Sequence, residues 1–180
     1  LWGQAKGKKA SSTVTFNFAH KMAKVLLTVK PGNGVTFDEV KSTALSLAGF
    51  KHNGTFNIAT GAATATGTAS NDAWKFTEGV HKAPVEVKEA EKELKYTLIF
   101  FPQDFASELA FTADIPGNTT LKAGIGFTVA NSEADGAAAK NNLVAGRQYN
   151  LTVTLHKTAA SLDQCNIQPW VVVNDNIDVD

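Results

Sequence analysis

The sequence predicts an all-β fold, an antiparallel Greek-key β-sandwich. Apolar and polar residues alternate with a period of two through many short segments, and turn residues separate these segments at regular intervals. The chain has 180 residues, 43% of them hydrophobic, which fits one domain with a core of its own. We expect residues 1–12, which are small, basic and polar after Trp2, to be a linker, and residues 13–180 to form the sandwich.

The first strand signal, VTFNFAHKMAKVLLTVKP at residues 14–31, changes parity in its middle. Apolar positions are even-numbered up to Phe18 and odd-numbered from Ala23 onward. One flat strand would bury one set and expose the other. A corner at residues 19–22, where the chain leaves one sheet and enters another, removes this conflict. His20 lies at the corner, and we expect its imidazole to bond backbone groups that are freed there.

The next segments, 37–50 and 55–61, are predicted to be strands joined by a hairpin at Asn53-Gly54, the strongest short turn signal. Residues 61–72, small and rich in threonine, indicate an edge strand or a mobile loop. Further strands are expected at 72–79, 84–89, 93–103, 108–115, 120–130, 148–158 and 166–173. Only residues 86–94 and 134–143 favour a helix, and both are short and lie between strands.

Composition excludes several classes of function. Seventeen basic and 17 acidic residues give a formal charge of zero, which disfavours nucleic-acid and anionic-lipid binding. A single cysteine, Cys165, excludes an internal disulfide and a cysteine-based zinc site, and we interpret it as a half-buried thiol. No apolar run reaches the ~18 residues of a membrane-spanning helix. The chain begins without a signal segment, and we expect it to start inside a longer protein.

No constellation of catalytic or metal-binding residues is visible. The four histidines (His20, His52, His81 and His156) fall in separate segments without metal-ligand spacing. Nucleophile-elbow, zinc-protease and phosphate-loop motifs are absent, and GIGF at 124–127 is interpreted as strand rather than as a dinucleotide motif. The acidic tail at 174–180 suggests calcium, but a solvated chain end is the simpler interpretation. We therefore predict no enzyme activity, cofactor or metal.

Several motifs, in order across nearly the whole chain, resemble one known family. They are Phe18, His20, Ala23, Lys24 and Val25 in the first strand segment; Pro102 in FPQ at 101–103; Gly146 and Tyr149 in LVAGRQYNLTVTL at 143–155; and Trp170 in NIQPW at 166–170. This combination is similar to the fimbrillin family of Bacteroidales surface fimbriae, the Mfa-like or FimA-like subunits of type V pili.

The resemblance implies a two-domain subunit with two transthyretin-like sandwiches. Such a subunit is secreted as a lipoprotein precursor and assembles at the outer membrane surface of a Gram-negative bacterium. LWG at residues 1–3 is similar to the end of the family's first domain, so this chain is expected to be the carboxy-terminal domain with its linker. The lipidated cysteine, the arginine cleavage site and the first-domain groove would then lie upstream of Leu1.

The resemblance also implies assembly by donor-strand complementation, with other fimbrial subunits as partners and a host or bacterial surface ligand as a further partner. An unpaired edge and an uncovered groove accept an extended segment from a neighbour, and a head-to-tail contact builds a filament. The donor residues expected here are Val171, Val172, Val173, Ile177 and Val179. Because this tail is short, it also suits a tip or accessory subunit, or a strand that completes its own sheet.

Two other classes of function compete with a fimbrial subunit. A surface carbohydrate-binding module would expose Trp74, Phe76 or Tyr96 as a stacking platform, whereas a subunit would bury these rings and expose an apolar edge. The alternation of Trp74 and Phe76 favours the core. A hydrolase would need two convergent carboxylates or a nucleophile with its base, and the sequence offers no such pair.

Overall fold

The computed structural model describes residues 1–7, 13–118, 120–135, 139–170 and 173–178. The strands of the first half are β1 (Thr13–Phe18), β2 (Ala23–Pro31), β3 (Ala44–Ala48), β4 (Asn53–Asn57), β5 (Ala62–Thr66), β6 (Trp74–Lys75) and β7 (Val85–Lys88). Those of the second half are β8 (Glu93–Phe100), β9 (Gln103–Asp104), β10 (Leu109–Asp114), β11 (Leu121–Ile125), β12 (Asn142–Leu143), β13 (Arg147–His156), β14 (Ala159–Pro169) and β15 (Val173–Asp178). The helices are α1 (Phe37–Ser42) and α2 (Thr128–Asp135).

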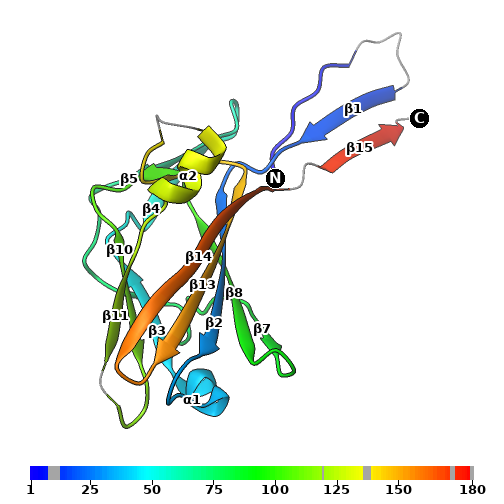
Figure 1. Cartoon of the computed structure of the whole chain (residues 1–180). Helices are drawn as coiled ribbons and strands as arrows, with labels where there is room; N and C mark the ends of the chain where they lie inside the picture. Colours follow the sequence, from blue (N-terminus) through cyan, green and yellow to red (C-terminus); the bar gives the residue numbers. More distant parts are fainter. Residues whose placement is uncertain (8–12, 119, 136–138, 171–172, 179–180) are drawn as a thin grey trace.

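Two sheets form the body of the molecule (Figure 1), which confirms the predicted all-β sandwich. The larger has the order β14-β13-β2-β8-β7 and the smaller the order β11-β10-β3-β6. Their paired strands are antiparallel except β2 and β13, which run parallel with Leu27 opposite Leu151. That pair departs from the purely antiparallel prediction. The Greek-key connectivity and the transthyretin-like form of the sandwich stay predictions.

Alternating apolar residues of the two sheets meet in one core. In β2 the odd-numbered residues from Ala23 to Val29 are at most 2% exposed, as the parity of the sequence predicts. Leu45 of β3 and Phe111 of β10 lie in the same buried cluster. Each fully buried side chain of this kind contributes about 1.5–3 kcal/mol, so packing holds a chain without a disulfide.

The two long sides of the sandwich differ. On one side β11 of the smaller sheet contacts β14 of the larger. On the other side the edge strands are short, because β6 has two residues and β7 has four. The space between β6 and β7 is called the open side below.

A separate two-stranded sheet extends away from the sandwich (Figure 1). It consists of β1 and β15, paired antiparallel from Thr13 opposite Asp178 to Phe18 opposite Val173, and is called the arm. The parity change therefore separates two sheets, as predicted. The sheet that the chain leaves at the corner is the arm rather than the other layer of the sandwich.

Residues 1–7 do not extend freely into solvent. Trp2 and Ala19 exchange backbone hydrogen bonds of 3.0 and 2.9 Å, and Gly3 packs against Phe18. The Trp2 indole Nε1 donates to the Ile58 carbonyl at 2.9 Å, while the Lys21 ammonium lies 5.1 Å above the ring. The first part of the predicted linker is thus fixed to the corner.

The hairpin predicted at Asn53-Gly54 is wrong. Both residues begin β4, and the turn to β5 lies at residues 58–61, where the Asn57 side chain accepts two backbone N–H groups and Gly61 has φ +69°. A glycine is needed at position 54 for another reason: the backbone packs closely on the Phe101 ring, and a Cβ there would lie 2.5 Å from it. Of residues 61–72, only Ala62–Thr66 form the expected edge strand, β5, and Ser70 makes an isolated bridge to Phe50.

Neither α1 nor α2 was predicted at its observed position. The strand predicted at 37–50 begins with α1, because Thr36 and Glu39 form a reciprocal capping box that starts a helix. The strand predicted at 120–130 ends at Ile125, and α2 follows GIGF, although no helix was expected there. Of the two segments that favoured a helix, 86–94 instead contains the end of β7, a turn and the start of β8. Among the described residues of 134–143, only 134–135 belong to α2.

Candidate functional site

Residues of the motifs that carry the family resemblance meet where the arm joins the sandwich. His20, between β1 and β2, stacks on Trp170, which follows β14; the ring centroids lie 3.6 Å apart and the planes differ by 7°. Both side chains are half-buried. His20 was expected to be structural, and ring stacking is a contact that the sequence did not specify. The stack ties the start of β2 to the end of β14.

Gly146 completes this junction through its backbone. It has φ +75°, its N–H donates to the Met22 carbonyl at 2.9 Å, and its carbonyl accepts the Trp170 N–H at 3.0 Å. A Cβ at this position would lie 3.1 Å from the His20 carbonyl oxygen. A glycine is therefore required both by the left-handed conformation and by the close approach. The parallel pairing of β2 and β13 starts here.

Tyr149 anchors β13 beneath the junction. Its side chain is 0% exposed, its hydroxyl accepts the Val144 N–H at 3.0 Å, and it donates to Asn131 Oδ1 at 3.1 Å. Burial raises the pKa of Tyr149. Asn131 of α2 also donates to the Lys140 carbonyl at 2.7 Å and to the Asn142 carbonyl at 2.9 Å. Asn131 was not among the predicted residues, because no helix was expected at α2.

The other predicted motif residues lie elsewhere along β1, β2 and β8. Phe18 ends β1 and stacks on Phe16 with ring centroids 6.0 Å apart. Ala23 is fully buried at the start of β2, and Lys24 beside it is half-buried. Pro102 follows β8 and is half-buried.

The arm has an apolar face. Val14, Phe16 and Phe18 of β1 are half-buried, while the residues between them are exposed. Val14 lies opposite Ile177 and Phe18 opposite Val173 in the register with β15. The other expected donor residues (Val171, Val172 and Val179) lie outside the described residues. A two-stranded sheet alone is marginally stable in water, so the arm contributes little stability of its own.

The open side presents an apolar edge. Val85 and Val87 of β7 are 38% and 46% exposed. They border a cavity of about 340 Å³ together with Leu94 and Tyr96. The Thr97 N–H donates to the Pro84 carbonyl at 2.9 Å, and bonding alternates along an antiparallel pair, so the backbone groups of Val85 and Val87 point to the free edge. On this side of the described structure, β7 therefore presents an apolar edge with outward-facing backbone groups.

Comparison with known proteins identifies the family. The model of the fimbrillin-like family matches residues 1–170. The chain belongs to the fimbrillin-like family. The matched range includes the arm strand β1, the corner and the junction residues.

Similar proteins from Bacteroides agree with this assignment. A candidate fimbrium subunit of Bacteroides uniformis, Fim1C, is 27% identical over 179 residues, covering 97% of this chain and 52% of that protein. A solved candidate cell adhesion protein of Bacteroides uniformis superposes with a TM-score of 0.60 at 25% identity, over 87% of this chain and 53% of the other. One from Bacteroides ovatus has the same fold, with a TM-score of 0.59 at 24% identity over 88% and 48%. The fimbrillin-like chain thus spans about half the length of these relatives.

The aromatic platform proposed for a carbohydrate-binding module is largely absent from this fimbrillin-like chain. Phe76 is 0% exposed and Tyr96 is 4% exposed, so neither ring can stack on a ligand. That part of the alternative is wrong, and the core interpretation of Phe76 is confirmed. Trp74 is half-buried and keeps part of its indole accessible.

The fimbrillin-like relatives are named as fimbrial or adhesion proteins rather than enzymes. Across the described residues, no group of three or more His, Cys, Asp or Glu side chains is arranged to hold a metal ion. In that same part of the chain, none of the helices has the length and apolar character needed to cross a membrane. Cys165 is half-buried as predicted, and burial raises its pKa to about 12, so its thiol stays protonated at neutral pH.

Proposed function

We propose that this chain is the carboxy-terminal domain of a structural or adhesive subunit of a bacterial surface fimbria, and that the subunit assembles by donor-strand complementation. Membership of the fimbrillin-like family and the names of the relatives support the fimbrial role. The length of the chain, about half that of the relatives, supports a domain of a larger subunit. The observation that carries the assembly mechanism is the arm.

The arm suits strand exchange for a physical reason. β15 pairs only with β1 among the described strands, outside the sandwich. Its release costs the backbone hydrogen bonds of one short ladder and leaves the core of the sandwich intact. A neighbouring subunit that offers an equivalent edge restores the same bonds, so exchange is nearly balanced in free energy while it links two subunits. In the isolated chain, β15 would then occupy its own β1 until a neighbour replaces it.

Repeated exchange of this kind is head-to-tail, does not close on itself, and builds a filament. By the family resemblance, the acceptor groove lies in the upstream domain and is opened by arginine-specific cleavage of a lipoprotein precursor at the outer membrane. The partners are then other fimbrial subunits at the cell surface, with a surface ligand for a subunit at the tip.

The test uses the full-length precursor. It is cleaved with an arginine-specific protease and run on an unheated denaturing gel, where strand-exchanged polymers give a ladder. Three forms are compared: the native sequence, a deletion of residues 171–180, and a control in which these residues are replaced by a Gly/Ser segment of equal length. A ladder from the native form alone supports donor-strand assembly by a stalk subunit.

The other outcomes also decide the question. A ladder from all three forms would mean that the tail is not the donor. No ladder from the correctly cleaved native form would refute polymerisation and leave a tip or accessory subunit.

A further inference from the structure

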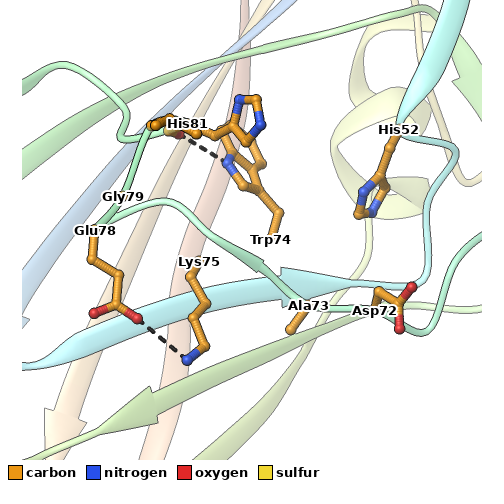
Figure 2. Close-up of a pocket in the computed structure, with 9 residues that line it drawn as sticks. His52, Asp72, Ala73, Trp74, Lys75, Glu78, Gly79 and His81 are labelled. Atoms are coloured by element: carbon orange, nitrogen blue, oxygen red, sulfur yellow. Dashed lines mark hydrogen bonds and ion pairs between the residues drawn. The ribbon is translucent and has the colours of Figure 1, made fainter.

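A cavity of about 550 Å³ opens beside β6 (Figure 2). His52, Trp74 and His81 line it, and Figure 2 shows His52 across the hollow from Trp74. A second cavity of about 400 Å³ shares these three residues. Both volumes lie within the ~300–1,000 Å³ that small-molecule sites occupy. Neither cavity is lined by residues of the arm or of the junction.

Aromatic rings with fixed orientations border both cavities. The Trp74 indole Nε1 donates to the His81 carbonyl at 3.0 Å. The Trp74 ring packs edge-to-face on Phe50, Phe76 and Phe100 with centroids 6.2, 5.8 and 5.8 Å away. His52 stacks on Phe50 with centroids 4.3 Å apart and is itself exposed. The indole is therefore held on a buried aromatic base while part of it faces the cavities.

Polar groups surround these rings, and their charges cancel. Lys75 pairs with Glu78 at 3.3 Å, and Asp72 and Lys82 add one acidic and one basic group. Within the described part of the chain, the Asp72 carboxylate makes no hydrogen bond or ion pair, and it is exposed at the cavity. A site with balanced charge and free hydrogen-bonding groups favours a neutral polar ligand over an anion.

We propose that these two cavities bind a neutral pyranose saccharide, with the Trp74 indole beneath one sugar ring and Asp72 and His52 bonding its hydroxyl groups. The apolar C–H face of a pyranose matches an aromatic ring, and its vicinal hydroxyls match a carboxylate and an imidazole. The site is separate from the arm. It adds glycan recognition to the subunit, independently of how the subunits assemble.

The full-length protein is tested on an array of neutral oligosaccharides that end in galactose, mannose, fucose or N-acetylglucosamine, with sialylated and sulfated counterparts alongside. The strongest neutral binder is then titrated calorimetrically against Asp72→Ala, His52→Ala and Trp74→Ala. Asp72 and His52 are exposed, so their variants should fold even if loss of the indole destabilises the core. The matched control is Glu91→Ala, an exposed carboxylate in the turn between β7 and β8.

We expect a neutral saccharide to bind, and Asp72→Ala and His52→Ala each to weaken it by about tenfold, the loss of one good contact. Glu91→Ala should bind like the native protein. Absence of binding to any neutral glycan, binding only to sialylated or sulfated glycans, or equal affinity of Asp72→Ala, His52→Ala and the control would each overturn the proposal. The polymer ladder should be unchanged in Asp72→Ala, which separates failure of this site from failure of assembly.

Discussion

Replacing Trp170 with alanine should destabilise the chain, because the indole closes the junction between arm and sandwich. Its ring lies 3.6 Å from that of His20, nearly parallel. A fully buried Trp→Ala substitution costs about 3–5 kcal/mol. Since Trp170 is only half-buried, we expect about 2 kcal/mol, of which about 0.5–1.5 kcal/mol comes from the aromatic pair itself. The Trp170 N–H bond to Gly146 is a backbone bond and persists in the variant.

The assay is urea unfolding of the native chain, Trp170→Ala, His20→Ala and the double variant. A double-mutant cycle isolates the ring contact, and we expect a coupling free energy of about 1 kcal/mol. Amide hydrogen exchange gives a second readout: exchange in β1 and β15 should accelerate in the single variants, while the central strands β2 and β13 stay protected. Additive effects, with a coupling below about 0.3 kcal/mol, would refute the stacking argument. Unchanged exchange in the arm would show that the junction does not hold it.

Three further substitutions test other parts of the fold by the same unfolding assay. Asn131→Ala should cost about 2–4 kcal/mol, because it leaves the buried Tyr149 hydroxyl without its acceptor and frees two carbonyls; a loss under 1 kcal/mol would contradict the network. Gly146→Ala should lower the free energy of unfolding by about 1–3 kcal/mol, because alanine is strained at the positive φ of this position. An unchanged free energy would show that the backbone can adopt another conformation there. For Asp163, burial acts to raise the pKa, but hydrogen bonds from Thr154 and Ser161 and the ion pair with Lys30 hold it below its usual value. That stabilisation is present above the unfolded pKa of about 3.9 and is lost as the pH falls through the folded pKa, so Asp163→Asn should be destabilised at pH 7 and the deficit should shrink as the pH falls through the acid range. A deficit that does not shrink with falling pH would assign the effect to packing.

Local periodicity predicted much of the fold. The parity change near His20 located the corner, and the odd-numbered positions of β2 are the buried ones. α1 was missed even though Thr36 and Glu39 form a capping box, because a strand pattern extended over the same residues. Gly54 was misassigned because a glycine needed for packing against Phe101 has the same local signature as one needed for a turn. For Gly54 the deciding contact is with a residue distant in the sequence, whereas the capping box of α1 is local and was outweighed by the strand pattern.

The candidate sites depend on contacts between distant segments. His20, Gly146 and Trp170 were singled out by family resemblance, and only the three-dimensional structure places them in one junction. His52 and Asp72 had no signal in the sequence, because the cavity that they line forms between separate segments. The alternation of apolar and polar residues also does not predict how deeply each side chain is buried. Phe76 is fully buried, whereas Trp74 stays partly accessible.

The central claim, that β15 leaves its own β1 to link subunits, is tested most directly by locking the arm. Thr15 and Asn176 lie opposite each other in the ladder, within the Cα separation that a disulfide bridges. Thr15→Cys and Asn176→Cys are introduced into the full-length protein in a Cys165→Ser background, and polymer ladders are compared with and without reductant. We predict no ladder from the oxidised protein and its return on reduction. A ladder of equal extent from the fully oxidised protein would contradict donor-strand exchange through β15.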